Sequence, residues 1–258
     1  MMIRSLWVAA SGMSGQEFNI SVISNNLANV NTTGFKKGRA EFQDLLYQTV
    51  QRGSAPQSPV GIQLGHGVKI SGTQKIFTQG DLHPTDGPLD LVIEGDGFFQ
   101  VLRSDGSIAY TRDGSFKRSA DGLIVTTQGY LLEPDIYIDE NATDLAITPE
   151  GRVFARMVGV VEPVELGQIE LAKFINPAGL ESIGGNLFIQ TAASGDPILG
   201  EPGMDGLGTI AQGFLEMSNV KVVEEIVNMI VAQRAYEINS KAIQTSDEML
   251  QMANNLRR

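Results

Sequence analysis

Apolar side chains recur every seven residues at the start of the chain, which is the periodicity of a helix that packs on another helix. Two rows share the a and d positions of a coiled-coil heptad, namely Leu6, Met13, Ile20 and Leu27, and then Ala9, Gln16, Ile23 and Val30. The pattern predicts one long helix over residues 3–33. Gly34 would end it, because glycine adopts the left-handed conformation after a helix at low cost.

The end of the chain has the same periodicity over residues 216–256. Two adjacent rows are Val222, Met229, Tyr236, Ile243 and Leu250, and then Ala235, Ala242, Met249 and Leu256. Acidic residues near the start of this helix and two arginines at its end complement the helix dipole. Because the two helices are alike in pattern, we expect them to pair as a coiled coil; the alternative is that both pack on one globular core.

The middle of the chain has a different pattern, built from short apolar runs between turns. Asp-Gly pairs begin at positions 86, 96, 105, 113 and 121, and such pairs favour tight hairpins. The runs between and after them, which begin with residues 89–94, 98–102, 108–111 and 123–126, predict an antiparallel sheet or barrel. The expected fold is therefore α+β, with a terminal-helix domain (residues 1–35 and 214–258), an extended connector (36–75) and an all-β domain (76–213).

Charge separates the same regions. Residues 76–213 carry 21 acidic and seven basic side chains, whereas residues 1–75 have a net charge of +4 and residues 214–258 of −1. An overall charge of −11 argues against binding to nucleic acid or to an anionic membrane surface. The chain has no cysteine, which excludes disulfides and thiolate metal sites. We also expect no membrane insertion, because no apolar run approaches the roughly 20 residues of a spanning helix, and no cleaved signal peptide.

A search for catalytic or cofactor-binding patterns gives little. His66 and His83 stand apart from any metal-binding or triad pattern. The glycines at 95 and 97 follow a strand, but residue 100 is glutamine and no helix follows, so this is a turn and not a dinucleotide site. We therefore expect no enzymatic activity, no cofactor and no metal. Paired carboxylates in the acidic β region leave a hydrolase as the alternative.

Several segments resemble the signatures of flagellar rod, hook and hook-associated proteins. They are residues 24–36 (SNNLANVNTTGFK), 95–101 (GDGFFQV), 110–116 (YTRDGSF), 212–220 (QGFLEMSNV) and 233–241 (QRAYEINSK). The segments lie at the beginning, middle and end, so the resemblance covers essentially the whole chain. Within the family, residues 44–50 (DLLYQTV) and 179–187 (GLESIGGNL) are most similar to distal-rod members, although the loop around residues 52–61 looks shorter than in some members.

The resemblance implies a structural subunit of the flagellar basal body that polymerises helically into a hollow rod across the periplasm. It implies export by the flagellar apparatus without cleavage, and contact with other rod and hook proteins, a rod-cap protein and the surrounding rings. Two alternatives stay open: a proximal-rod or hook subunit, and a wall hydrolase carried on the same scaffold.

The heptad rows then become candidate subunit contacts, because one subunit alone cannot bury them. We expect the interface at Leu6, Met13, Ile20, Leu27, Asn25, Asn26, Asn29, Val222, Met229, Tyr236, Ile243 and Leu250. The asparagine amides would bond across subunits, or else cap the helix end locally. We further expect Tyr47 to Gly67, which includes Pro56 and Pro59, to wedge between subunits and stiffen the rod, unless it is an idle surface loop.

Overall fold

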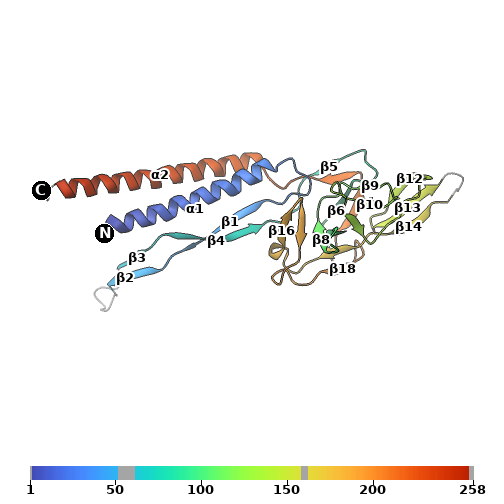
Figure 1. Ribbon diagram of the computed structural model, residues 1–258, viewed down its shortest axis with the longest axis horizontal. Coiled ribbons are helices and arrows are strands. Elements are labelled where there is room, and N and C mark those ends of the chain that lie inside the picture. Colours follow the sequence, from blue (N-terminus) through green and yellow to red (C-terminus); the bar gives the residue numbers. More distant parts are fainter. Residues whose placement is uncertain (1, 52–61, 158–161, 256–258) are drawn as a thin grey trace. The chain divides into compact units, whose positions relative to one another are not determined.

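A computed structural model describes residues 2–51, 62–157 and 162–255, and the chain divides into two compact units. Unit 1 contains residues 1–28, 38–75 and 221–258, and unit 2 contains residues 29–37 and 76–220. The segment that we expected to be a separate connector, 36–75, falls largely within unit 1. Figure 1 shows the helices and strands of each unit.

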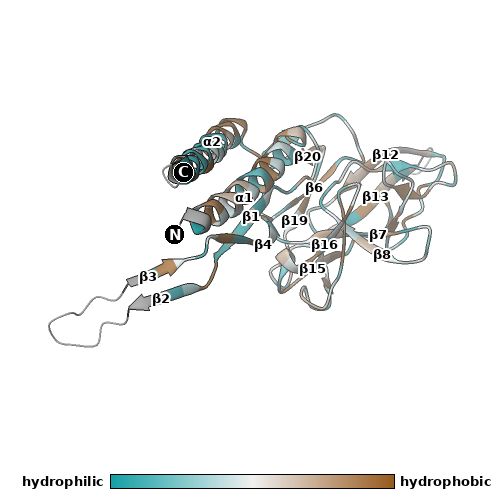
Figure 2. Ribbon diagram, turned by 60° about the vertical axis from the view of Figure 1, so that its left-hand side comes forward, coloured by the Kyte–Doolittle hydropathy of each residue, from teal (hydrophilic) through white to brown (hydrophobic). Residues whose placement is uncertain are grey.

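Unit 1 combines the two terminal helices with a long β-hairpin. Its elements are α1 (Met2–Ala28), β1 (Gly38–Asp44), β2 (Tyr47–Gln51), β3 (Ile62–Gly65), β4 (Val68–Lys75) and α2 (Val222–Asn255). Strand β1 pairs antiparallel with β4, and β2 with β3. Helix α1 packs against both α2 and the β1–β4 pair, and both views show it beside them (Figures 1 and 2).

Both helices are shorter than the heptad pattern predicts. Helix α1 ends at Ala28 and not at residue 33, because the next residues form turns: the Thr32 hydroxyl donates to the Asn29 side chain, and the Thr32 amide to the Asn29 carbonyl. Short polar side chains compete with the helix in this way. Helix α2 begins at Val222 and not at residue 216, because residues 214–216 pair as a strand.

Unit 2 is built from antiparallel strand pairs. Its strands are β5 (Leu82–Pro84), β6 (Leu91–Glu94), β7 (Phe98–Leu102), β8 (Ile108–Thr111), β9 (Lys117–Arg118), β10 (Ile124–Val125), β11 (Leu131–Glu133), β12 (Ala142–Ile147), β13 (Arg152–Met157), β14 (Val164–Gln168), β15 (Leu171–Lys173), β16 (Glu181–Gly184), β17 (Leu187–Ile189), β18 (Ile198–Gly200), β19 (Thr209–Gln212) and β20 (Phe214–Glu216). A short 3-10 helix, η1, spans Pro177–Gly179.

These strands form one large sheet and several small ones. The large sheet has the order β16-β17-β8-β7-β11-β10-β9, with β15 joining β7 to β18. Strands β12, β13 and β14 form a second sheet, while β6 pairs with β19 and β5 with β20. Strand β20 joins the C-terminal segment to the β unit directly before α2 begins.

The strands predicted around the Asp-Gly pairs are confirmed. Strands β7 and β8 have the predicted bounds, and five residues separate them. In that connection the Gly106 amide donates to the Arg103 carbonyl, and Gly106 has a φ of 81°, which other residues adopt only at a cost. Local turn chemistry therefore determines much of the β unit.

The main core of unit 2 lies between these strands. It is a cluster of buried aliphatic residues and two phenylalanines, which includes Leu91, Phe99, Val101 and Ile210. A second, mostly aromatic cluster consists of Phe98, Tyr110, Ala172, Phe174, Leu180 and Phe188. Unit 2 thus has an apolar interior of its own, and the polar cluster described next is embedded in this unit.

Candidate functional site

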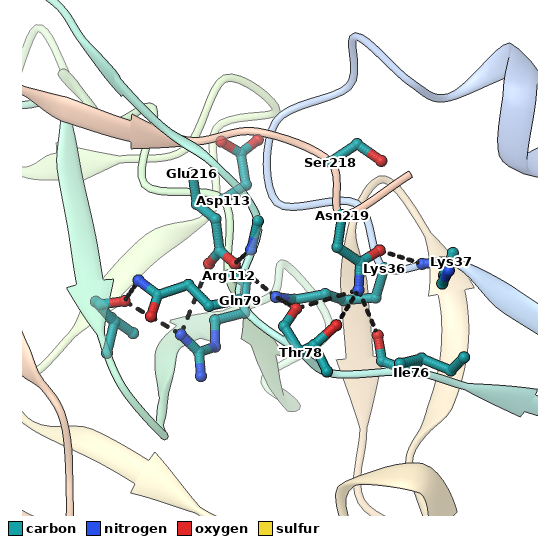
Figure 3. Close-up of polar contacts among 12 residues, drawn as sticks. Lys36, Lys37, Ile76, Thr78, Gln79, Arg112, Asp113, Glu216, Ser218 and Asn219 are labelled. Atoms are coloured by element: carbon teal, nitrogen blue, oxygen red, sulfur yellow. Dashed lines mark hydrogen bonds and ion pairs between the residues drawn. The ribbon is translucent and has the colours of Figure 1, made fainter. Parts of the chain in front are cut away.

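A buried ionic cluster joins three remote segments of unit 2 (Figure 3). Lys36 follows the first helical segment, Arg112 follows β8, and Glu216 ends β20. The Lys36 Nζ lies 2.6 Å from the Glu216 Oε1, and an Arg112 guanidinium nitrogen lies 3.6 Å from the Glu216 Oε2. The side chains are only 0%, 4% and 1% exposed for Lys36, Arg112 and Glu216. We call these three residues the ionic cluster.

The cluster also makes hydrogen bonds to the backbone, although the Glu216 Oε2 and the Arg112 Nε have no hydrogen-bond partner among the described residues. Lys36 also donates to the Thr78 carbonyl at 2.8 Å, and the Gly80 amide donates to the Glu216 Oε1 at 2.9 Å. Arg112 donates to the carbonyls of Ile93 and Gly95. These bonds connect the cluster to the segment before β5 and to the end of β6.

The cluster contains two cations and one anion, so its charge is not balanced internally. Burial lowers the pKa of Lys36, although the Glu216 carboxylate acts in the opposite direction. Burial likewise lowers the pKa of Arg112, against the attraction of Glu216 and Asp96. Glu216 is therefore the one residue of the three whose charge both of the others need.

Asn219 connects the same region through its amide (Figure 3). Its Oδ1 accepts from the Lys37 backbone amide at 2.8 Å, and its Nδ2 donates to the Ile76 carbonyl at 2.8 Å and to the Thr78 carbonyl at 3.1 Å. The Ile76 amide donates in turn to the Lys37 carbonyl. Residues 37, 76 and 219 all belong to unit 2, and each lies within two residues of a boundary of this unit in the sequence. The Asn219 side chain therefore connects three terminal segments of unit 2.

Sequence reasoning did not select Lys36, Arg112, Glu216 or Asn219 as site residues. A lysine, an arginine and a glutamate far apart in sequence normally lie on the surface. Each of the four residues does fall inside a segment that carries the family resemblance, at 24–36, 110–116 or 212–220. This shared location was the one feature of the sequence that could have identified them. The family signatures thus contain the residues of the ionic cluster and Asn219.

In unit 1, the two helices meet along a row of small and polar residues. The Ser5 and Ser246 hydroxyls are 3.3 Å apart, and the Asn26 Nδ2 donates to the Glu225 Oε2 at 3.1 Å. Between them, a Cβ added to Gly12 would lie 2.8 Å from the Asn239 Nδ2, which shows how closely the helices approach. We call this row the polar seam; α1 contributes to it at steps of seven residues.

The sequence pattern identified one partly buried row of α1, whereas the buried residues of α2, namely Glu225, Ala232 and Ser246, lie in neither of its predicted rows. Ala9 and Ile23 are buried as the heptads predict, but the polar seam, and not the Leu6 row, completes the contact. Leu6, Met13, Ile20 and Leu27 are half-buried, as are Met229, Ile243 and Leu250, while Val222 and Tyr236 are exposed. The physical reason is size, because serine, glycine and alanine allow a closer approach of the helix backbones than leucine does.

Two of the asparagines predicted to lie at the subunit interface, Asn26 and Asn29, make hydrogen bonds within the chain. Asn26 is buried, donates to Glu225 and to the Gly38 carbonyl, and accepts from the Gly38 amide. Both of its amide hydrogens are therefore used within the subunit. Asn29 accepts from the Thr32 hydroxyl, which corresponds to the alternative of local capping, and Asn25 is exposed.

Within the predicted stiffening segment, Tyr47 is exposed and its ring covers Gly65. Gly67 has a φ of 105° beside Ser11 of α1. Pro56 and Pro59 lie outside the described residues.

Unit 2 contains a hollow of about 310 Å³, which we call the polar hollow. Its lining is mostly hydroxyl and amide groups, and Asp113 is the one carboxylate among the lining residues. Across residues 2–51, 62–157 and 162–255, no three His, Asp or Glu side chains are grouped to hold a metal ion. In the same ranges no helix is long and apolar enough to cross a membrane.

Family models match three regions of the chain. They describe a flagella basal body rod protein at residues 6–36, a flagellar hook protein FlgE/F/G D1 domain at 92–155, and a flagellar basal body rod FlgEFG protein C-terminal region at 211–256. Each residue of the ionic cluster lies in a different one of these three regions.

Full-length relatives agree with the family models. The chain is 56% identical to the flagellar basal-body rod protein FlgG of Borreliella burgdorferi over all of both chains. It is 50% identical to FlgG of Caulobacter vibrioides, over 99% of this chain and all of that one, and 40% identical to FlgG of Bacillus subtilis over all of both. The chain therefore belongs to the FlgG family of flagellar basal-body rod proteins.

Proposed function

We propose that this chain is the structural subunit of the flagellar distal rod and polymerises helically, through its terminal helices, into a hollow shaft that transmits torque from motor to hook. Family membership supports the rod assignment. The observation that supports the mode of assembly is an apolar stripe on α2 that faces away from α1.

This outer stripe is exposed along the first half of α2. Its members are Val223 (77% exposed), Val227 (53%), Ile230 (47%), Val231 (62%) and Ile238 (66%). At about 100° per residue they lie on the side of α2 opposite Glu225 and Ala232, which face α1. The colouring of α2 in Figure 2 shows hydrophobic residues at its beginning.

Covering the outer stripe supplies a driving force for assembly. Burying one valine or isoleucine side chain completely contributes about 1.5–3 kcal/mol, and the stripe already has partial cover from the helix itself. Contiguous apolar surface of this kind marks an interaction site in a protein that is otherwise strongly acidic. A second copy of the chain is the partner we propose.

The hydrolase alternative receives no support from the polar hollow. Glycoside hydrolysis uses two carboxyl groups roughly 5–10 Å apart, on either side of the scissile bond. The hollow presents Asp113, whose Oδ1 already accepts from the Thr33 hydroxyl and the Ser115 amide. We therefore propose a non-enzymatic subunit.

The remaining partners follow from family membership alone. We propose that the chain contacts other rod and hook proteins, the rod-cap protein and the surrounding ring proteins, after export by the flagellar apparatus without a cleaved signal peptide. The assembled rod would cross the periplasm. We also propose that the segment from Tyr47 to Gly67, which contains β2 and β3, packs between subunits and keeps the rod straight.

Polymerisation of the purified full-length chain, followed by electron microscopy, tests the proposal. Wild-type protein should form rods, and Val227→Asp should not, because a carboxylate would replace an apolar side chain in every contact. Val164→Asp is the matched control, since Val164 is an exposed valine on β14 of unit 2. Rods of equal yield from Val227→Asp would rule out assembly through the outer stripe.

A further inference from the structure

The polar seam fixes the axial register of the two helices. Ser5 lies opposite Ser246, Gly12 opposite Asn239 and Asn26 opposite Glu225, so the helices are antiparallel and the contacts are equally spaced on both. The same register places Glu17 level with Arg234, because Glu17 comes five residues after Gly12 and Arg234 five residues before Asn239. These two residues carry opposite charges.

Both charges point away from the seam. At about 100° per residue, Glu17 lies about 140° around α1 from Gly12 and 180° from Asn26. Arg234 lies about 160° around α2 from Ala232, which is buried against α1. Glu17 and Arg234 are both exposed.

Glu17 is the one acidic residue of α1, and Arg234 and Lys241 are the basic residues of α2. Arg234 lies within the outer stripe, in line with Val227 seven residues earlier and close to Ile230 and Ile238. In the register of the seam, Lys241 is level with Ala10 and not with an acid. Of the two basic residues of α2, only Arg234 is therefore level with an acidic residue of α1.

We propose that the outer stripe of α2 in one subunit packs on the outward face of α1 in the next subunit, where Arg234 pairs with Glu17. The inference rests on the proposed function and adds the partner surface to it. Ala10, Ser14, Ser21 and Ser24 surround Glu17 with small exposed side chains, which would let the valines and isoleucines of α2 approach closely. The contact uses two different surfaces, so each subunit keeps one of each free and the contact repeats along a helix.

The charge pair would select the register of this contact. Apolar side chains alone tolerate a shift along the helices, whereas a shift would leave Glu17 and Arg234 away from water without a partner. A like charge at either position repels as well as removing the attraction. Because every added subunit makes this contact, loss of the charge pair raises the concentration needed for polymerisation.

Charge reversal tests the pair in the full-length protein. Glu17→Arg and Arg234→Glu should each raise the critical concentration for rod formation at least about tenfold. The double variant Glu17→Arg/Arg234→Glu should restore it. Glu17→Arg/Lys241→Glu should not, and serves as the matched control for register. Circular dichroism of each variant checks that the helices and strands are retained.

Mixing the two single variants separates contact between subunits from contact within one. An equimolar mixture should polymerise near the wild-type concentration, because each altered α1 can meet an altered α2 of the other variant. Rescue in the double variant without rescue in the mixture would overturn the proposal in favour of an internal pair. Single variants that polymerise as wild type does would overturn the pairing and leave the proposed function standing. Wild-type protein that forms no rods would contradict both.

Discussion

Removing the carboxylate of Glu216 should destabilise unit 2 more than removing either cation of the ionic cluster. Glu216→Gln keeps the size of the side chain but removes the one anion that is buried with Lys36 and Arg112. Leaving a buried charge uncompensated costs about 3–5 kcal/mol. Lys36→Met, in contrast, leaves Arg112 and the Gly80 amide beside Glu216, so we expect a smaller loss of about 1–3 kcal/mol.

The melting temperature of the β unit measures this difference. For a chain of this size, 1 kcal/mol corresponds to roughly 2–4 °C, so Glu216→Gln should lower the melting temperature by roughly 6–20 °C. Calorimetry and far-ultraviolet circular dichroism follow unit 2, while fluorescence of Trp7, the one tryptophan, reports on α1 in unit 1. If Lys36→Met proved as damaging as Glu216→Gln, the reasoning from unbalanced charge would be refuted.

Three further outcomes are expected. Burial lowers the pKa of Lys36 in the folded state, so the unfolded state binds more protons at pH values between that pKa and 10.5. In this window the unfolding free energy of wild type, relative to that of Lys36→Met, should therefore rise with pH. Urea titrations in which this difference fell with pH would contradict the prediction. Gly12→Ala should change stability little, because alanine improves helix propensity by up to about 1 kcal/mol and the Asn239 amide can move aside. Gly12→Leu should separate α1 from α2, which circular dichroism would detect as a loss of helix. Equal effects of the two variants would argue against the close approach of the helices. Deleting residues 52–62 should leave rods that form but bend, and straight rods of unchanged persistence length in electron micrographs would identify this segment as an idle loop.

The sequence predicts well what local chemistry determines. The strands from β6 to β8 follow from Asp-Gly turns and short apolar runs, and their bounds are nearly those predicted. The presence of two long terminal helices follows from heptad periodicity, whereas their ends do not: the turn at Asn29 overrides a pattern that continues to Val30. Periodicity predicts which face of a helix is apolar, but not where hydrogen bonds of a turn replace those of the helix at its end.

Two features of the site required three-dimensional information. The heptad rows of apolar residues looked like the contact between α1 and α2, yet Ser5, Gly12 and Asn26 form it, because a periodic pattern does not say which partner covers which row. The ionic cluster depends on contacts between residues 36, 112 and 216, which no local pattern specifies. Small or polar residues at multiples of seven positions on both helices were the overlooked signal for the polar seam.

Thiol labelling of Val227→Cys tests the central claim, that the outer stripe of α2 is covered by a neighbouring subunit, most directly. The chain has no cysteine of its own, so the introduced thiol is the only one that reacts. We predict rapid labelling in dilute monomer and strong protection in assembled rods, while Val164→Cys on unit 2 reports the labelling of a site outside the stripe in the same two states. Equally rapid labelling of Val227→Cys in monomer and in rods would contradict the account.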